Sequence, residues 1–370
     1  MKLYTLREIA REVETPPFLS MSRKRNFFNL PEWFALLERC CLEKGWHAMV
    51  AAAENDELAI VCRHQPRGHA LFSFTTLYTP RFDLLGHSPA LRSIREFGRQ
   101  LACSSGRLEY IRLEGLDVSG GSFRALLDGL GSAGWAVKPY FGWAMWCENT
   151  ANIGFEYYLS ARNSVLRNTW KRKQALLAKT ATPRWKIYGV GEDPDFFITL
   201  YEQIHQRSWK KPEPFPDFIP GLIRMAAAVG ALRMGVLFIN DLPAAAQFWI
   251  VWEGTATIYK LVHAQEFAQF SPGTLLTMEM MRRVLNEDKP AEIDFGRGDD
   301  SYKKLWLSSR SERWGIEAAN PRTLNGIPRS FRILAGIARD SMSRKLSRAV
   351  RRAAPGSSGV HLRNGRPGRS

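Results

Sequence analysis

The residues best suited to chemistry lie within Glu292–Trp306, where the chain reads EIDFGRGDDSYKKLW. The segment begins as a strand, and its two glycines permit a sharp, exposed turn at the strand's end. Carboxylates such as Asp294 and Asp299 could orient an amine or accept its proton there. Tyr302 and Lys303 could stabilise an oxyanion or hold a phosphate. Taken alone, the pattern still favours a solvated turn with surface ion pairs, each worth about 0–1 kcal/mol.

A second candidate site is a helix start formed by Ser271, Pro272, Gly273 and Thr274. Ser271 is placed to be the N-cap, and Pro272 occupies the first helical position, where its missing N–H costs nothing. Gly273 and Thr274 then present backbone N–H groups, and the glycine lets a ligand approach the backbone closely. Such a helix start can bind a phosphate, although the same residues also simply begin a helix well.

Strands must position both candidates. Residues 244–252 and 255–263 have strand character and precede a helix predicted over 272–286, after which another strand leads into the 292–306 segment. This order places the helix start and the polar segment in one structural unit. His263 is the only histidine near that unit, and a lone histidine on a strand is more often a packing residue than a catalytic one.

Two units of similar content precede the C-terminal segment. Helix and strand patterns alternate over residues 1–159 and again over 183–320, which predicts an α/β (α+β) fold of two lobes, each a mixed sheet flanked by helices. The similarity suggests an internal duplication by architecture alone. Residues 160–182 are predicted to form a basic connecting helix with Ser160 as its N-cap. Residues 321–370 form the last segment.

That last segment has its own charge pattern. Residues 321–370 carry twelve Lys and Arg and one acid, so +11 of the chain's +16 is local to them. Apolar residues spaced by three or four from Phe331 to Val350 predict a basic amphipathic helix, and the residues from Pro355 are expected to be disordered. Three interpretations stay open: a solvated helix, an anchor on an anionic lipid surface, and a nucleic-acid contact. The local charge does not indicate a nucleic-acid-binding fold.

The amino-acid composition further narrows the classes of protein to which the chain can belong. With 45% hydrophobic and 12% aromatic residues the chain can build real cores. Its five cysteines form no C-x-x-C pair, and their odd number suits a reduced compartment. No run approaches the roughly 18 apolar residues of a membrane span, and no residue cluster has metal-ligand spacing. We therefore expect a cytoplasmic protein without a metal.

The 292–306 segment resembles the DF-x-RG-D-x-x-YK-x-x-W signature of the GNAT acyltransferases typified by CelD, a family associated with cellulose biosynthesis and related to FemAB. The family's strand–strand–SPG–helix core resembles AAAQFWIVWEGTATIYKLVHAQEFAQFSPGTLL, and its preceding helix ends like HQRSWK. Its N-terminal half resembles Leu77–Pro80 with Phe82–Leu85, and its basic helix resembles SARNSVLRNTWKRKQALL. The resemblance covers about residues 25–320.

This resemblance implies two GNAT-like lobes, with acyl-CoA bound in the second as the donor substrate. The strand before the SPG helix would splay to admit the pantetheine arm, and the diphosphate would meet the helix start at Ser271–Thr274. The usual GNAT phosphate loop, Q/R-x-x-G-x-G/A, is replaced here by SPG, as in FemAB-like relatives. Those relatives take aminoacyl-tRNA as donor, so this alternative stays open.

In such an enzyme an acceptor amine attacks the thioester directly, so the resemblance assigns roles. Asp294 and Asp299 are the candidates for orienting or deprotonating the amine. Tyr302 would protonate the leaving thiolate, and Lys303 would contact phosphate or oxyanion. The residues expected to line the substrate cleft are Gln247, Trp249, Tyr259 and His263.

The resulting prediction is an N-acyltransferase that moves an acyl group from acyl-CoA to an amine acceptor, with polysaccharide or cell-envelope precursors as the acceptors considered. The alternatives are a FemAB-like transferase that depends on aminoacyl-tRNA and a non-catalytic accessory protein of polysaccharide synthesis. The basic helix leaves open a peripheral location at the inner face of the membrane.

Overall fold

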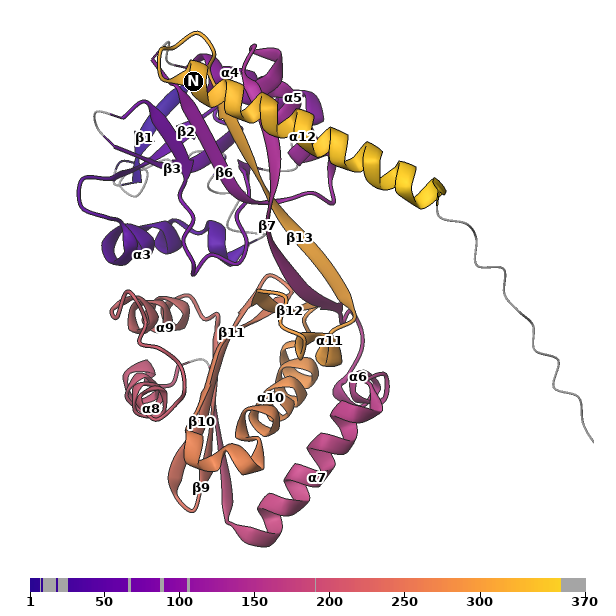
Figure 1. Ribbon diagram of the computed structural model, residues 1–370. Coiled ribbons are helices and arrows are strands. Elements are labelled where there is room, and N and C mark those ends of the chain that lie inside the picture. Colours follow the sequence, from indigo (N-terminus) through magenta and orange to yellow (C-terminus); the bar gives the residue numbers. More distant parts are fainter. Residues whose placement is uncertain are drawn as a thin grey trace, which may run out of the picture.

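The strands of the protein form one continuous mixed sheet (Figure 1). The computed structural model describes residues 1–6, 8, 18, 26–65, 68–86, 90–104, 107–189 and 191–353, of which 341–353 by backbone alone. Within this part the sheet has 13 strands. The tail from Pro355, predicted to be disordered, lies outside the described residues.

The sheet order is β1-β2-β3-β4-β6-β13-β7-β12-β11-β10-β9-β8. The first-lobe strands are β1 (Lys2–Thr5), β2 (His47–Ala52), β3 (Leu58–His64), β4 (Ala70–Ser73), β6 (Tyr110–Asp117) and the short β5 (Leu85–Gly86), which pairs with β3. The second-lobe strands are β8 (Pro183–Tyr188), β9 (Leu232–Ile239), β10 (Leu242–Trp252), β11 (Thr255–His263) and β12 (Glu292–Arg297). The strands between them are β7 (Ala136–Asn149) and β13 (Ser309–Ala319).

Both lobes repeat one pairing pattern. In the first, β2, β3 and β4 are antiparallel and β4 then pairs in parallel with β6. In the second, β9, β10 and β11 are antiparallel and β11 then pairs in parallel with β12. A parallel pair needs a crossover, which includes α4 (Leu91–Cys103) in the first lobe and α10 (Pro272–Arg283) in the second. The predicted α/β fold is confirmed, and the architecture is that of a duplicated unit.

Strands β7 and β13 connect the lobes through backbone hydrogen bonds. β13 pairs with β6 and along most of β7, whereas the C-terminal end of β7 also pairs with β12. β13 therefore belongs by pairing to the first lobe, although it follows the second lobe in sequence. We keep 1–159, 160–182, 183–320 and 321–370 as a proposed division of the chain, with β13 as the strand that returns.

Helices cover both faces of the second half of the sheet and also pack on the first half. In the second lobe, α8 (Pro194–Gln206) and α9 (Phe218–Ala228) lie on one face, and α10 with α7 (Ser164–Thr180) on the other (Figure 1). In the first lobe, α4 packs against α5 (Gly121–Ser132). The lobes also touch through α3 (Pro31–Cys41), whose Trp33 meets Phe218 edge to face at 5.7 Å.

The connecting helix begins later than predicted. α7 starts at Ser164, and the side chain of Asn163 caps it by accepting from the Val165 N–H at 2.8 Å. Ser160, predicted as this cap, instead ends the short helix α6 (Phe155–Ser160), and its hydroxyl donates to the Tyr157 carbonyl. The prediction of Ser160 as N-cap is wrong because a second cap-forming residue three positions later lies at the break between the two helices.

The C-terminal segment contains a long helix, α12 (Gly326–Ala353), which packs on β7 and β13 of the first lobe and then extends past it (Figure 1). Ile333 is buried there among Tyr110, Ala136 and Ala319. None of the helices in the described ranges is long and apolar enough to cross a membrane.

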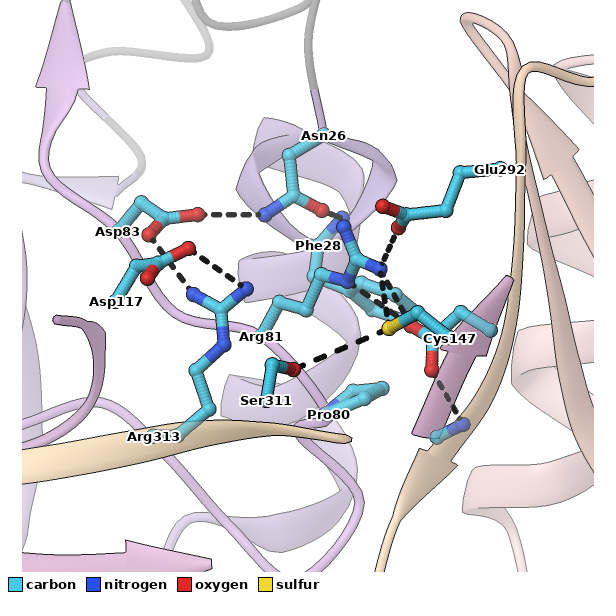
Figure 2. Close-up of polar contacts among 12 residues, drawn as sticks. Asn26, Phe28, Pro80, Arg81, Asp83, Asp117, Cys147, Glu292, Ser311 and Arg313 are labelled. Atoms are coloured by element: carbon cyan, nitrogen blue, oxygen red, sulfur yellow. Dashed lines mark hydrogen bonds and ion pairs between the residues drawn. The ribbon is translucent and has the colours of Figure 1, made fainter. Parts of the chain in front are cut away.

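A partly buried arginine ties the second lobe to the first (Figure 2). Arg81, in the loop after β4, donates from Nε to Asp294 Oδ2 at 2.9 Å and from Nη2 to Glu292. Both carboxylates belong to β12. Asp294 is fully buried, and its other oxygen accepts from the Gly296 N–H at 2.7 Å. The ion pair thus fixes the end of β12 against the first lobe.

We expect Arg81→Met to lower the free energy of unfolding by about 3–5 kcal/mol, because Asp294 would remain as a buried charge without its partner. Urea denaturation followed by tryptophan fluorescence measures the change. In the control Arg124→Met, which breaks an exposed pair with Asp128, the loss should stay within about 0–1 kcal/mol.

The double variant Arg81→Met/Asp294→Asn tests the same explanation, because it removes the uncompensated charge. The double variant should recover part of the free energy of unfolding that Arg81→Met loses. A single variant Arg81→Met as stable as the control, or a double variant less stable than the single one, would show that the buried charge is not what holds β12.

Candidate functional site

A gap opens in the second lobe where β11 and β12 separate. The two strands pair at only three positions, the last being Thr257 with Asp294. β11 then continues along β10 to His263, whereas β12 turns at Gly296, which has φ 63°, and pairs Arg297 with Met145 of β7. A cavity of about 620 Å³ occupies the gap. Because β11 is paired on one side only, its freed edge forms one wall.

The N-terminus of α10 lies at one end of this cavity. Ser271 occupies the N-cap position with φ 51°, but its side chain makes no capping hydrogen bond, contrary to the prediction. Pro272 begins the helix as predicted and is buried. Gly273 and Thr274 line the cavity, and a helix start without a side-chain cap leaves first-turn N–H groups available. A Cβ on Gly273 would lie 3.2 Å from Leu261 Cδ2, so only glycine fits without displacement.

A lysine and a histidine adjoin this helix start. Lys210 Nζ donates to the Leu261 carbonyl at 2.6 Å, and burial lowers the pKa of Lys210 to about 8, with Lys260 acting in the same direction. The His263 ring packs against Trp209 at 4.4 Å between centroids. Burial also lowers the pKa of His263, and Lys210 adds to the effect. At neutral pH this end of the cavity therefore holds a lysine cation beside an uncharged imidazole.

The polar turn after β12 forms the other end. Lys303 is buried, and its Nζ donates to the carbonyls of Arg297 at 2.9 Å and Gly298 at 3.3 Å. It also pairs with Asp300 at 3.4 Å. Burial lowers the pKa of Lys303 against the opposing effect of Asp300. Lys303 thereby braces the turn from within, and the half-exposed Tyr302 stands at the cavity's rim.

The cavity wall between the two ends carries an unpaired acceptor. Gln247 Nε2 donates to Thr277 Oγ1 at 3.3 Å, but Gln247 Oε1 is buried and has no hydrogen-bond partner in the described structure. Both residues line the cavity. A buried acceptor left without a donor suits a ligand that brings an N–H group.

The structure brings most of the predicted residues together at this cavity. The predicted residues that line it are Gln247, Tyr259, His263, Ser271, Gly273, Thr274, Tyr302 and Lys303. Tyr259 lines the cavity, but its hydroxyl is engaged elsewhere, because it donates to the Tyr78 carbonyl at 2.6 Å.

Four predicted residues do not line the cavity: Pro272, which is buried at the start of α10, and Asp294, Asp299 and Trp249. Asp294 is buried beneath Arg81. Asp299 is outside the cavity, where it accepts from Trp146 Nε1 at 2.8 Å and Arg310 Nε at 3.0 Å. Trp249 is fully buried in the second-lobe core, where its cluster includes Leu275 and Leu276 of α10.

Sequence reasoning missed four charged residues that line the cavity: Lys210, Lys260, Arg297 and Asp300. Arg297 sits 4.0 Å above the Trp143 ring of the first lobe. Signals existed for two of them: Lys210 ends the HQRSWK segment, and Asp300 is the second residue of an Asp-Asp pair. In the described chain, no group of three or more His, Cys, Asp and Glu could hold a metal ion.

A known protein family and several solved structures resemble this chain. Residues 164–304 match the acetyltransferase (GNAT) domain family. Among solved structures the chain resembles FemX, with TM-score 0.56, 11% identity, and 85% of this chain and 97% of that chain covered. It also resembles a conserved protein of unknown function from Bacteroides thetaiotaomicron VPI-5482, with TM-score 0.53, 9% identity, and 85% and 98% covered. No curated protein matches it significantly.

The lowered pKa of Lys210 predicts a pH-dependent stability. The folded state releases this proton near pH 8 and the unfolded state near pH 10.5, so between these values the unfolded state binds more protons and stability rises with pH. Relative to Lys210→Met, the wild type should gain about 2–3 kcal/mol across that window. Urea denaturation at several pH values measures the difference.

The control for this measurement is Lys211→Met, at an exposed neighbouring position. Its difference from the wild type should not change with pH in the same window. If the difference in stability between the wild type and Lys210→Met is also independent of pH, the ammonium group of Lys210 is not buried.

Proposed function

We propose that the chain transfers an acyl group from acyl-CoA to an amine acceptor, because residues 164–304 match the acetyltransferase (GNAT) domain family. The observation that carries this proposal is the position of the cavity. It lies between the separated strands β11 and β12, and the N-terminus of α10, without a side-chain cap, stands at one end. A long, phosphorylated thioester fits a gap of that shape.

The donor's diphosphate is assigned to the helix start. The N–H groups of Gly273 and Thr274 and the positive end of the α10 dipole favour a dianion there, and Lys210 supplies a cation beside it. The pantetheine arm would run between β11 and β12, where Gln247 Oε1 can accept from one of its amides.

The acceptor end is assigned to the turn after β12. Asp300 lines the cavity and can hold an acceptor ammonium and take its proton, after which the amine attacks the thioester carbonyl. The carbonyl–sulfur bond then breaks, Tyr302 donates its proton to the departing thiolate, and the Tyr302 phenolate takes the second proton from the acylated nitrogen. Lys303 holds the turn through the Arg297 and Gly298 carbonyls. Asp294 and Asp299 support this segment from outside the cavity.

CoA binding tests the donor site. We expect Gly273→Val to raise the Kd for CoA about tenfold or more, because the added side chain would project toward Leu261 and the cavity. Isothermal titration calorimetry measures it, and a thermal melt checks the fold. In the control Gly131→Ala, a Cβ meets nothing within 4 Å, so the Kd should not change.

The same titration has a pH dependence. Wild-type affinity should fall as pH rises through about 8, because Lys210 loses its charge, and Lys210→Met should bind weakly at every pH. If the wild type binds no CoA, or if Gly273→Val binds it as well as the wild type, the donor assignment is wrong.

Turnover tests the acceptor end, with a panel of acyl-CoA donors and amino-sugar or envelope-precursor amines. We expect Tyr302→Phe to lower kcat by about 10²-fold, the usual worth of a general acid, with little change in KM. Asp300→Asn should raise KM for the amine and lower kcat. Asp299→Asn, outside the cavity, should change kcat only a few fold. Unchanged turnover in Tyr302→Phe would exclude it as the acid.

The likeness to FemX favours a second candidate, a FemAB-like transferase with aminoacyl-tRNA as donor. Incubation with charged tRNA or with acyl-CoA distinguishes the two, since only the true donor supports product formation. A polysaccharide or cell-envelope acceptor is suggested by the CelD-like 292–306 segment, and a cytoplasmic location by the odd number of cysteines. A non-catalytic accessory protein would form product with neither donor and bind no CoA.

A further inference from the structure

Large exposed apolar side chains gather at the start of α12. Leu324 is 89% exposed, Ile327 41%, Phe331 69% and Leu334 53%. Ile327, Phe331 and Leu334 occur at four- and three-residue intervals, so on the helix they share one face, and Leu324 lies in the turn just before α12. In the sequence the same spacing continues at Ala338, Met342 and Leu346. We call Leu324, Ile327, Phe331 and Leu334 the apolar stripe.

The stripe is not the face that holds the helix to the protein. α12 docks through Ser330, Ile333 and Ile337, which lie roughly a third of a turn away around the helix. Ser330 Oγ donates to the Ala319 carbonyl at 3.3 Å, and Asp340 pairs with Lys138 at 2.7 Å. The helix is therefore already anchored on the first lobe, and its stripe is directed outward. An apolar face of this kind on a docked helix indicates an external partner.

The charge of the same helix indicates what that partner is. Residues 322–352 contain nine Lys and Arg, and their one acid is Asp340, which Lys138 already pairs. The chain beyond Asp340 carries five of these cations within nine residues, Arg344 to Arg352. An apolar stripe on a strongly cationic helix is the pattern of helices that lie in the interface of an anionic membrane.

We propose that α12 binds the surface of an anionic lipid bilayer, with the apolar stripe inserted among the acyl chains and the basic residues against the headgroups. The C-terminal part of the helix extends past the first lobe (Figure 1), away from the strands on which α12 packs. The proposal does not depend on the acyl-transfer reaction. It places the catalytic lobe beside the membrane, where acceptors carried by lipids would be found.

Two other partners fit the observations less well. A second copy of the chain would bring two such cationic helices together, and their repulsion opposes pairing. A nucleic acid would match the charge, but it offers no apolar surface for side chains as large as Phe331 and Leu334. Both partners are outcomes that the experiment below can reveal.

Vesicle flotation of the full-length chain tests the proposal, with vesicles of phosphatidylglycerol and phosphatidylcholine against vesicles of phosphatidylcholine alone. The wild type should float with the anionic vesicles only. The variant Phe331→Ser/Leu334→Ser should bind them about tenfold more weakly, because it removes apolar contacts and leaves every charge in place. Both side chains are exposed, so the fold should be retained, which a thermal melt checks.

The matched control is Leu242→Ser, whose side chain is 54% exposed at the β9–β10 turn in the second lobe. It should float like the wild type. Failure of the wild type to float, equal flotation with both vesicle types, or equal flotation of Phe331→Ser/Leu334→Ser would overturn the proposal. So would wild-type binding to duplex DNA, or a stripe-dependent dimer in sedimentation, when neither is accompanied by flotation.

Discussion

The second lobe depends on one constraint: every backbone group of β12 must find a hydrogen-bond partner although the strand leaves β11 after three paired residues. The other edge of β12 provides most of these partners, because β12 pairs with β7. Strand β7 pairs in turn with β13 and so connects to the first lobe. The gap that holds the cavity and the continuity of the sheet therefore have the same origin. Without β7, a strand drawn away from β11 would expose an unpaired edge to the cavity and to water.

The ion pair between Arg81 and Asp294 fixes the point at which β12 leaves β11. At the residue where β12 turns, the Gly296 N–H donates to Asp294, and the charge of Asp294 is balanced by Arg81 of the first lobe. A carboxylate buried this completely requires a partner of opposite charge. The position of the cavity wall thus depends on contact between the lobes. A motif residue that might be taken for a catalytic base proves to be part of the structure that shapes the site.

The sequence allows the elements and the helix start of the site to be predicted, because periodicity and capping are local. Ser271–Thr274 and the strand before them are found in this way. Asp294 is different, since its partner Arg81 lies 213 residues earlier and no local pattern connects them. Trp249 also escapes prediction, because its burial depends on how α10 packs on the face of β10. Asp299 and Asp300 are adjacent in a turn, and only the turn's path decides that Asp300 faces the cavity.

The duplicated architecture shows why only one lobe has a wide gap. In the first lobe, too, the parallel pair β4–β6 ends after three positions, the last joining Phe72 and Arg112. Two residues beyond Arg112, the Glu114 N–H donates at 2.9 Å to Ser73 Oγ on the neighbouring strand. Two residues beyond Asp294, at the equivalent point of the second lobe, the Gly296 N–H donates to the carboxylate of its own strand.

This difference explains how the two lobes diverge. A freed N–H that bonds across the gap draws the strands together, and the first-lobe cavity at that point measures only about 210 Å³. An N–H that bonds within its own strand leaves the neighbour free to separate, and the cavity reaches about 620 Å³. The acceptor of one backbone N–H therefore differs between the lobe whose strands stay close at this point and the lobe whose strands separate around the larger cavity. In the second lobe the acceptor is a buried carboxylate, so Asp294 requires Arg81 to balance its charge. In the first lobe the acceptor is a neutral serine hydroxyl, so no arginine is needed at that point.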